Sequence, residues 1–161
     1  MEEDIKEAAG YIEDRIGRKT EIGMITGTGL GSLTGCMHIE DRMAYDEIPH
    51  FPESTVHGHR GTLAVGTVRG RHVCALEGRF HLYEGYTPAQ IAFSIRVMKL
   101  LNAKYLFISS AAGGLDPLFA PSDLMLVTDH INMTACNPLT GFNLELFGPR
   151  FPDMTLSLIH I

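Results

Sequence analysis

The sequence predicts an α/β fold in which a mixed, twisted β-sheet is flanked by helices. Apolar residues recur at helical spacing over residues 3–17 and again after Pro88. Short apolar runs end at glycine-rich turns, as in residues 21–31, which is typical of buried strands. A two-residue turn at Arg69-Gly70 joins two further runs, so part of the sheet is expected to be antiparallel.

The first expected helix is amphipathic and ends at Gly17, because glycine favours the left-handed conformation of a helix C-cap. Its apolar positions are Ile5, Ala8, Ala9, Ile12 and Ile16. We expect this helix to serve in packing.

The expected strand at residues 21–26 leads into Gly27-Thr-Gly-Leu-Gly31. Backbone N–H groups of such a turn can approach an anion closely, and a following helix N-terminus would add its dipole. The turn does not match the dinucleotide-binding fingerprint, because Ser32 occupies the final glycine position, and the sequence contains no P-loop motif. A plain tight turn is the alternative interpretation.

A hairpin of residues 62–68 and 71–76 delivers the polar loop 77–88 to the end of a strand. Loops at strand ends hold the ligands of many α/β proteins, since the sheet fixes their position. This loop is therefore the first candidate for a binding site.

Three side chains of the loop suggest an anion bound next to a hydroxylated or aromatic ligand. Arg79 offers a planar, charged fork for a phosphate or carboxylate. His81 and Tyr83 could face the same side of an extended segment. The alternative is a solvated loop in which Arg79 pairs with Glu77 or Glu84.

The second helix is expected to begin at Pro88 and to end at Asn102. Thr87 and Gln90 have the spacing of a capping box, with proline at the first helical position. A buried stripe is expected from Ile91, Ile95, Met98 and Leu100 or Leu101, and Phe93 is expected in the core.

Two more strands are expected, at residues 104–110 and 123–129. Ala111-Ala-Gly-Gly114 follows the first of them, and small residues at a strand end let a ligand lie against the backbone. A loop rich in Pro, Gly and Asn continues to Gly148.

The composition excludes several classes of protein. The 161 residues are 45% hydrophobic and 20% charged, as in a single globular domain. A net charge of −6 argues against a nucleic-acid partner. No apolar run approaches the ~20 residues of a membrane span, and the acidic N-terminus lacks signal-peptide features, so we expect a cytoplasmic protein without a membrane partner. Cys36, Cys74 and Cys136 are too widely spaced to suggest a disulfide framework or a thiolate zinc site.

Residues 45–61 are rich in Pro, His and Gly and are expected to form a long functional loop. The pairs His57/His59 and His72/His81 raise the question of a metal. No carboxylate or thiolate lies at ligand spacing, so no metal is expected. His59 could instead donate a hydrogen bond to a phosphate.

The sequence of the polar loop, Gly78-Arg-Phe-His-Leu-Tyr-Glu-Gly-Tyr86, resembles the signature of the trimeric purine nucleoside phosphorylases. Further blocks resemble this family in order: Gly27-Thr-Gly-Leu-Gly31, Ile48-Pro-His-Phe-Pro52 with Ser54-Thr-Val-His-Gly-His59, Ala111-Ala-Gly-Gly114, Asp129-His-Ile-Asn132 and Arg150-Phe-Pro152. The resemblance implies that residues 1–154 are the N-terminal part of a single phosphorylase domain. We therefore expect a phosphorylase-like sheet that is incomplete because the C-terminal half is absent. Residues 155–161 depart from the family pattern and are expected to be an artefactual tail.

The resemblance also implies a set of site residues. Phosphate would be bound by Thr28, His59, Arg79, Phe80, His81 and Ala111, with His81 as the catalytic residue. The ribose and base would be contacted by Tyr83, Ala112, Gly113 and Phe151, the last in a neighbouring subunit of a homotrimer. Two positions depart from the family pattern. Thr28 stands where serine is usual and keeps the hydroxyl, whereas Ser110 stands where asparagine is usual, which leaves the backbone N–H groups of Ala111 and Ala112 as donors.

The implied reaction is the reversible phosphorolysis of purine (deoxy)ribonucleosides to the free base and (deoxy)ribose 1-phosphate. Inorganic phosphate is the nucleophile, so no metal or organic cofactor is expected. Fixed donors around the anion would stabilise the charged transition state. In this family the residues that grip the purine lie in a second half with no counterpart here, so base preference cannot be predicted and the chain alone is expected to be inactive.

Two alternatives stay open. The first is a methylthioadenosine phosphorylase of the same superfamily, for which a Gly-Thr-Gly turn is also typical. Comparing inosine with methylthioadenosine as substrates of the full-length enzyme would separate the two. The second is a non-catalytic module that binds phosphate or a sugar phosphate, which saturable phosphate binding without bond cleavage would support.

Overall fold

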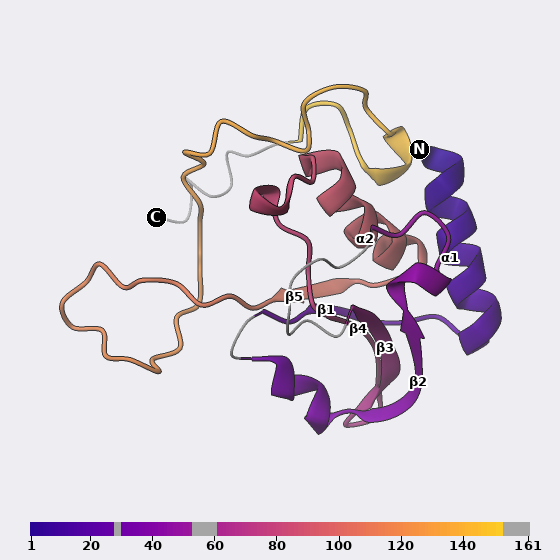
Figure 1. Cartoon of the computed structure of the whole chain (residues 1–161), viewed down its shortest axis with the longest axis horizontal. Coiled ribbons are helices and arrows are strands. Elements are labelled where there is room, and N and C mark those ends of the chain that lie inside the picture. Colours follow the sequence, from indigo (N-terminus) through magenta and orange to yellow (C-terminus); the bar gives the residue numbers. More distant parts are fainter. Residues whose placement is uncertain (28–29, 53–60, 153–161) are drawn as a thin grey trace. The chain divides into compact units, whose positions relative to one another are not determined.

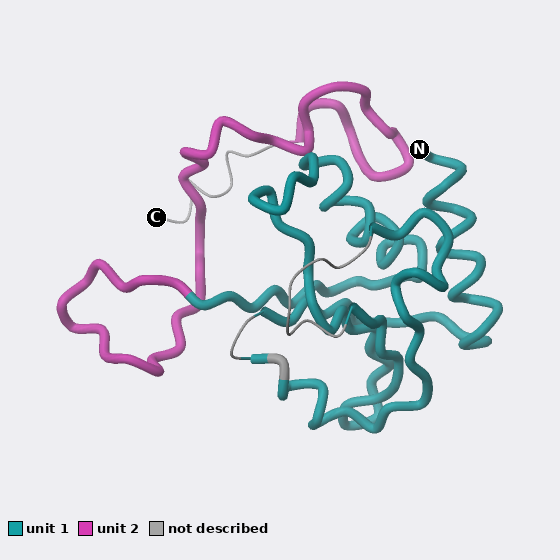
Figure 2. The backbone as a smooth tube through the Cα atoms, viewed as in Figure 1, with its two compact units in different colours: residues 1–111 teal, residues 112–161 magenta. Residues whose placement is uncertain are grey.

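A computed structural model describes residues 1–27, 30–52 and 61–152 of the chain (Figure 1). The chain forms two compact units, residues 1–111 and 112–161 (Figure 2). The sheet and the helices α1 and α2 belong to the first unit.

The first unit is built on a five-stranded mixed sheet with the order β2-β3-β4-β1-β5. Strand β3 (Thr62–Val68) is antiparallel to both β2 (His38–Ala44) and β4 (Arg71–Glu77). Strand β1 (Ile22–Ile25) runs parallel to β4 and to β5 (Tyr105–Ile108). The predicted fold class is confirmed, and the carboxyl ends of β4, β1 and β5 meet at one edge of the sheet.

The predicted hairpin is confirmed as β3 and β4. Arg69 and Gly70 have φ angles of 48° and 76°, as a two-residue turn that matches the strand twist requires. Val68 pairs with Arg71 directly across this turn.

Strand β2 was not predicted from the sequence. Its pairing with β3 is interrupted by a bulge between Ile39 and Asp41, and a bulge breaks the alternation of apolar and polar residues by which a strand is recognised. Gly66 of β3 lies opposite Ile39, and a Cβ added there would lie 2.1 Å from the carbonyl oxygen of His38. Close approach of the two backbones at the bulge therefore requires glycine.

The first helix, α1, spans Glu2–Ile16 and confirms the predicted amphipathic helix. Its buried residues are Ile5, Ala8, Ala9 and Ile12. Gly17 caps it in the left-handed conformation with φ 64°, and its N–H donates to the carbonyl of Glu13 at 2.8 Å.

The second helix, α2 (Pro88–Leu100), begins with the predicted capping box of Thr87 and Gln90. Its buried stripe was predicted only in part. Phe93, Ser94, Val97 and Met98 are buried, whereas Ile91 and Ile95 are only half-buried. The reason is the packing of α2 on the sheet, because Met98 faces Gly23 of β1 and Phe93 packs edge-on against Phe51 at 5.8 Å. Helices α1 and α2 lie side by side (Figure 1).

The sheet face that carries Ala64, Val73 and Ala75 is covered by Met37. Met37 ends η1 (Gly31–Cys36), a 3-10 helix that follows the glycine-rich turn. The expected helix after this turn is thus short and of the 3-10 type, so it supplies no α-helical dipole.

The predicted long loop of residues 45–61 starts with a short 3-10 helix, η2 (Tyr45–Glu47). Tyr45, Ile48 and Phe51 are buried, so this part of the segment is packed against the core. The rest of the predicted loop falls largely outside the described residues.

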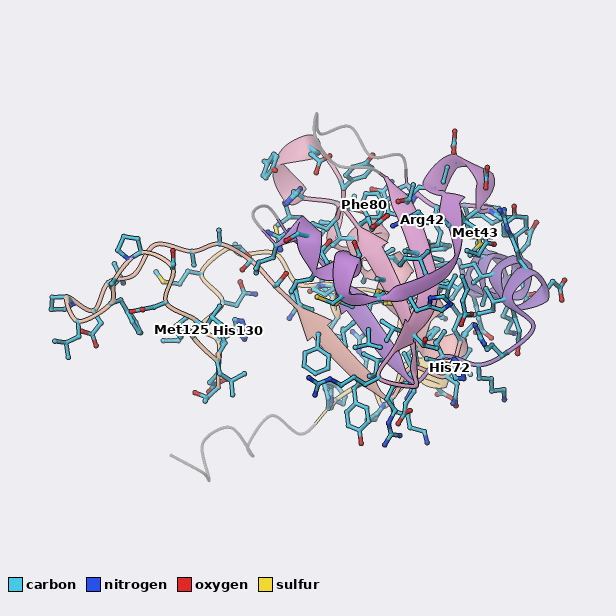
Figure 3. All side chains as sticks on the ribbon, turned by 90° about the horizontal axis from the view of Figure 1, so that it is seen from below. Arg42, Met43, His72, Phe80, Met125 and His130 are labelled. Atoms are coloured by element: carbon cyan, nitrogen blue, oxygen red, sulfur yellow. The ribbon has the colours of Figure 1, made fainter. Side chains whose placement is uncertain are left out.

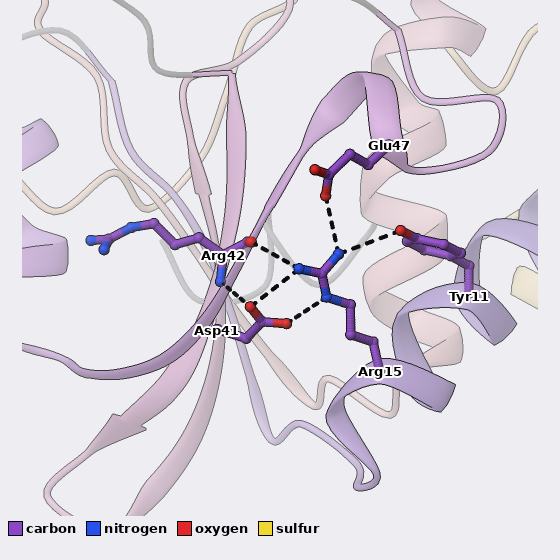
Figure 4. Close-up of polar contacts among 5 residues, drawn as sticks. All are labelled: Tyr11, Arg15, Asp41, Arg42 and Glu47. Atoms are coloured by element: carbon purple, nitrogen blue, oxygen red, sulfur yellow. Dashed lines mark hydrogen bonds and ion pairs between the residues drawn. The ribbon is translucent and has the colours of Figure 1, made fainter.

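Arg15 ties α1 to β2 and η2 (Figure 4). Its guanidinium donates to Asp41 Oδ2 at 2.7 Å, to Glu47 Oε2 at 3.0 Å and to the hydroxyl of Tyr11 at 3.4 Å. A further contact of 3.5 Å reaches the carbonyl oxygen of Arg42. These groups are exposed, so the cluster fixes the orientation of α1 more than it adds to stability.

The second unit contains η4 (Glu145–Phe147) but no strand among its described residues. The predicted strand at residues 123–129 is therefore wrong. Its apolar side chains are exposed, with Leu124 at 90% and Leu126 at 89%, and Met125 and His130 (labelled in Figure 3) are exposed as well. No neighbouring strand pairs with this segment in the described part of the chain, and a strand needs a partner for its backbone N–H and C=O groups.

Across the described ranges, none of the helices has both the length and the apolar character of a membrane span.

Candidate functional site

Three strand ends meet at the carboxyl edge of the sheet. The N–H and hydroxyl of Thr26, just after β1, both donate to the carbonyl of Leu76 at the end of β4, at 3.2 and 3.0 Å. Ser109, just after β5, donates its N–H to the carbonyl of Ile25 at 3.0 Å. The N–H of Gly27 then donates to Ser109 Oγ at 3.2 Å. These bonds hold the start of the glycine-rich turn beside the end of β5.

Arg79, in the loop after β4, reaches across to the same place. Its Nη1 donates to the carbonyl oxygen of Ser109 at 2.8 Å. A Cβ added to Gly27 would lie 2.6 Å from this oxygen and 3.1 Å from Arg79 Nη1. The guanidinium thus lies against the Cα of Gly27, in space that only glycine leaves open.

Arg79 makes no ion pair with any residue that the structure describes, which speaks against the alternative of a pair with Glu77 or Glu84. Its two hydrogen-bond acceptors are neutral, a carbonyl oxygen and an imidazole nitrogen. The positive charge is therefore held rigidly by partners that do not neutralise it, and it can attract an anion.

The hydrogen bonds of His81 fix its tautomer. Arg79 Nε donates to His81 Nε2 at 3.0 Å, so this nitrogen carries the lone pair, since arginine cannot accept. Nδ1 therefore carries the proton and donates to Glu84 Oε1 at 2.5 Å. Glu84 is the last residue of η3 (Leu82–Glu84), which brings the carboxylate back towards the imidazole.

Tyr83 stacks on His81, with ring centroids 4.6 Å apart and an interplanar angle of 21°. The two rings lie together as predicted, although η3 is a 3-10 turn and not an extended segment. Tyr83 is 77% exposed and so presents its hydroxyl to solvent next to the imidazole.

Aromatic packing anchors the start of the loop. Phe80 is 4% exposed and packs against Tyr45 at 5.3 Å and Tyr86 at 5.6 Å between centroids. The Tyr45 hydroxyl donates to the carbonyl of Gly78 at 2.9 Å, and burial raises the pKa of this hydroxyl well above its usual range. Any contact of Phe80 with a polar ligand must therefore come from its backbone.

The structure brings some of the predicted site residues together. Arg79, Phe80, His81 and Tyr83 form one cluster, and Ala111 follows Ser109 by two residues at the end of the first unit, where it is exposed. Thr28 and His59 lie outside the described residues. Ala112, Gly113 and Phe151 belong to the second unit, where all three are exposed.

Sequence reasoning missed Ser109 and Tyr45. Ser109 was assigned only to a strand, although a hydroxyl at a strand end beside a glycine-rich turn is a signal that could have been noticed. Tyr45 carries no such signal, because the carbonyl of Gly78 that it binds is far away in sequence.

The described residues contain no group of three or more His, Cys, Asp or Glu side chains that could hold a metal ion. Cys74 is buried, whereas Cys36 and Cys136 are exposed. The chemistry of the cluster is that of a cation, an imidazole and a phenol, which suits an anion attached to a hydroxylated ligand.

Comparison with known proteins gives a consistent result. The family model of the phosphorylase superfamily matches residues 21–158. Purine nucleoside phosphorylase 1 of Bacillus subtilis is 45% identical over 155 residues, which cover 96% of this chain and 57% of the relative. Purine nucleoside phosphorylase of Rattus norvegicus is 43% identical over 156 residues, which cover 95% and 54%. The chain thus spans about half the length of the curated relatives it matches.

Solved structures agree with the sequence comparison. Schistosoma mansoni purine nucleoside phosphorylase with a monocyclic inhibitor superposes with a TM-score of 0.87 at 41% identity, covering 95% of this chain and 57% of that one. Isoform 2 of the Schistosoma mansoni enzyme, in complex with cytosine and ribose-1-phosphate, gives 0.85 at 44% identity, with coverage of 95% and 55%. With the matched residues, the sheet order and these superpositions in agreement, this chain belongs to the phosphorylase superfamily.

Proposed function

We propose that this chain supplies the phosphate and ribose side of a purine nucleoside phosphorylase. The observation that carries the proposal is the position of Arg79. Its guanidinium is fixed at the meeting point of three strand ends and lacks an acidic partner among the described residues. The relatives from Bacillus subtilis and Rattus norvegicus are named purine nucleoside phosphorylases, which supports purine nucleosides as the substrate class.

In the proposed reaction, a phosphate oxygen attacks the anomeric carbon of the nucleoside. The glycosidic C–N bond breaks, and the purine leaves with the bonding electrons while the sugar passes through an oxocarbenium-like transition state. Arg79 and the backbone N–H of Ala111 would hold the phosphate, together with Thr28 and His59. His81, predicted as the catalytic and a phosphate-binding residue, has both ring nitrogens engaged by Arg79 and Glu84, so it would act by orienting the Arg79 guanidinium. Such fixed donors lower the energy of the charged transition state without reorganising.

We assign the sugar to residues that the family resemblance implies. Tyr83, stacked on His81, would bind ribose hydroxyls, with Ala112 and Gly113 as backbone contacts. Phe151 is 86% exposed and would cover the ribose of a neighbouring subunit in a homotrimer. Solved relatives bind cytosine with ribose-1-phosphate, adenosine, or hypoxanthine, which supports a nucleoside as the ligand. Phosphate would be the co-substrate, and the proposal requires no cofactor.

Binding of inorganic phosphate to the chain tests the proposal. Titration calorimetry should show saturable binding that weakens in Arg79→Gln by about tenfold or more, because a charge-assisted hydrogen bond is lost. Arg71→Gln is the matched control, since Arg71 pairs with Glu21 at the other end of β4. Equal affinity in wild type and Arg79→Gln would contradict the proposal.

A turnover assay forms the second arm of this test. We expect no release of hypoxanthine when the chain alone is mixed with inosine and phosphate, because the proposal assigns no described residue to the purine. Robust turnover would show that the purine is held by groups that this proposal omits.

A further inference from the structure

The buried carboxylate of Glu77 has no role among the site residues predicted from the sequence. Glu77 is the last residue of β4, two positions before Arg79, and is 5% exposed. It accepts hydrogen bonds from the hydroxyls of Thr34 at 2.6 Å and Thr62 at 2.7 Å. Arg42 Nε donates to it at 3.1 Å, and the two residues form an ion pair.

The two threonine donors come from different elements of the first unit. Thr34 lies in η1, directly after the glycine-rich turn of residues 27–31. Thr62 is the first residue of β3. The N–H of Gly61 also donates to the backbone carbonyl of Glu77, at 3.2 Å. One buried residue at the end of β4 therefore joins η1 to the start of β3.

The negative charge of Glu77 is compatible with an anion bound nearby. Arg42 compensates the carboxylate, so Glu77 does not oppose an anion held by Arg79. Each threonine hydroxyl can donate only one hydrogen bond, and the carboxylate receives it at a fixed position. The arrangement restricts the position of η1 and of the start of β3 relative to the end of β4.

We propose that Glu77 is a positioning residue for the phosphate site: it sets the mutual placement of η1, the start of β3 and the loop that carries Arg79. This inference rests on the proposed function. Glu77 itself would not touch phosphate. A site whose donors are held less closely loses affinity steeply, since small displacements of several donors add up.

The test compares variants that remove either one threonine donor or the Glu77 acceptor. Thr34→Val and Thr62→Val should each weaken phosphate binding by about tenfold, and Glu77→Ala should weaken it further. Glu77→Gln should bind phosphate more tightly than Glu77→Ala, because the amide oxygen of glutamine still accepts a hydrogen bond. Thr20→Val is the matched control, since Thr20 is buried and its hydroxyl donates to Leu101 O at 3.1 Å, remote from these segments.

A merely structural role would lower stability in Thr20→Val and Thr34→Val alike but leave the phosphate dissociation constant of the folded protein unchanged. That result, at a temperature where every variant is folded by circular dichroism, would overturn the inference.

Amide hydrogen exchange separates this inference from the proposed function. In Thr34→Val and Glu77→Ala, the amides of Met37 and Gly61 should exchange faster, because their hydrogen bonds lie in the segments that Glu77 joins. Exchange in Thr20→Val should match wild type at these positions. If the wild-type chain bound no phosphate, the proposed function would fail, while faster local exchange would still show that Glu77 joins the segments. Unchanged exchange rates in both variants would show that Glu77 does not hold η1 and the start of β3 together.

Discussion

At the scale of single residues, the site depends on one steric fit. The guanidinium of Arg79 lies against the Cα of Gly27, and both are held by Ser109. Conformational freedom is not the reason for glycine here, because the limit is the distance of 2.6 Å from a possible Cβ to a backbone oxygen.

Gly27→Ala should therefore displace Arg79 or the end of β5. We expect a loss of stability of about 1–3 kcal/mol from overpacking, and weaker phosphate binding in the folded protein. Urea unfolding and calorimetric titration measure the two effects. Gly35→Ala is the control, because a Cβ there meets no atom within 4 Å, and a similar loss in both variants would exclude the steric explanation.

The ionisation of Glu77 predicts a dependence of stability on pH. Burial is the largest single effect and favours the protonated form, but the hydrogen bonds from Thr34, Arg42 and Thr62 together with the charge of Arg42 outweigh it. The pKa of the folded state therefore lies below the ordinary value of 4.5, and the unfolded chain binds the proton more tightly. The ionised carboxylate stabilises the fold above pH 4.5, and this contribution is lost as the pH falls through the folded pKa.

In Glu77→Gln, the free energy of unfolding should fall less steeply below pH 4.5 than in the wild type. Urea unfolding at a series of acidic pH values measures the two slopes. Parallel curves would mean that Glu77 titrates alike in the folded and unfolded states.

At the scale of elements, local signals were sufficient where the determinant is local. The capping box of Thr87 and Gln90 and the left-handed cap at Gly17 each act within one helical turn. The start of α2 and the end of α1 were therefore predictable. The buried face of α2 was predictable only in part. Phe93 and Met98 are buried as predicted, whereas Ile91 and Ile95 are only half-buried, because the packing of the helix on the sheet decides which positions are covered.

The bulge in β2 gives a prediction at this scale. Gly66→Ala would place a Cβ within 2.1 Å of the carbonyl oxygen of His38, so β2 and β3 would have to separate. We expect a loss of about 1–3 kcal/mol in the free energy of unfolding. Thermal and urea unfolding of Gly66→Ala and Gly35→Ala would show the difference, and equal stability would indicate that the edge strand shifts without cost.

At the scale of the whole molecule, the two units differ in how their apolar residues are covered. The first unit buries side chains such as Ile12, Leu63 and Leu76 almost completely. In the second unit, Leu115 and Ile131 are exposed at 100% and 90%, and its backbone hydrogen bonds include local turns such as Phe119 N–H to Asp116 O.

This contrast predicts where the chain opens. Limited proteolysis should cut within residues 112–152 before it cuts within β1, β3 or β4, because local stability follows buried apolar contacts and protected hydrogen bonds. Mass spectrometry of early fragments identifies the sites. First cuts inside the central strands would show that the two units unfold together.

The sequence by itself determined the fold class, the helix caps, the hairpin and the family resemblance, because each rests on residues that are neighbours in the chain. It did not determine strand β2, where a bulge hides the alternation, or the absence of a strand at residues 123–129, where apolar character was present but a pairing partner was not. Only the tertiary structure decided that Gly27, Arg79 and Ser109 meet, and that Glu77 joins Thr34 to Thr62. The physical reason is that parallel strands bring their ends together through hydrogen bonds between segments far apart in sequence, and no local pattern records which ends will meet.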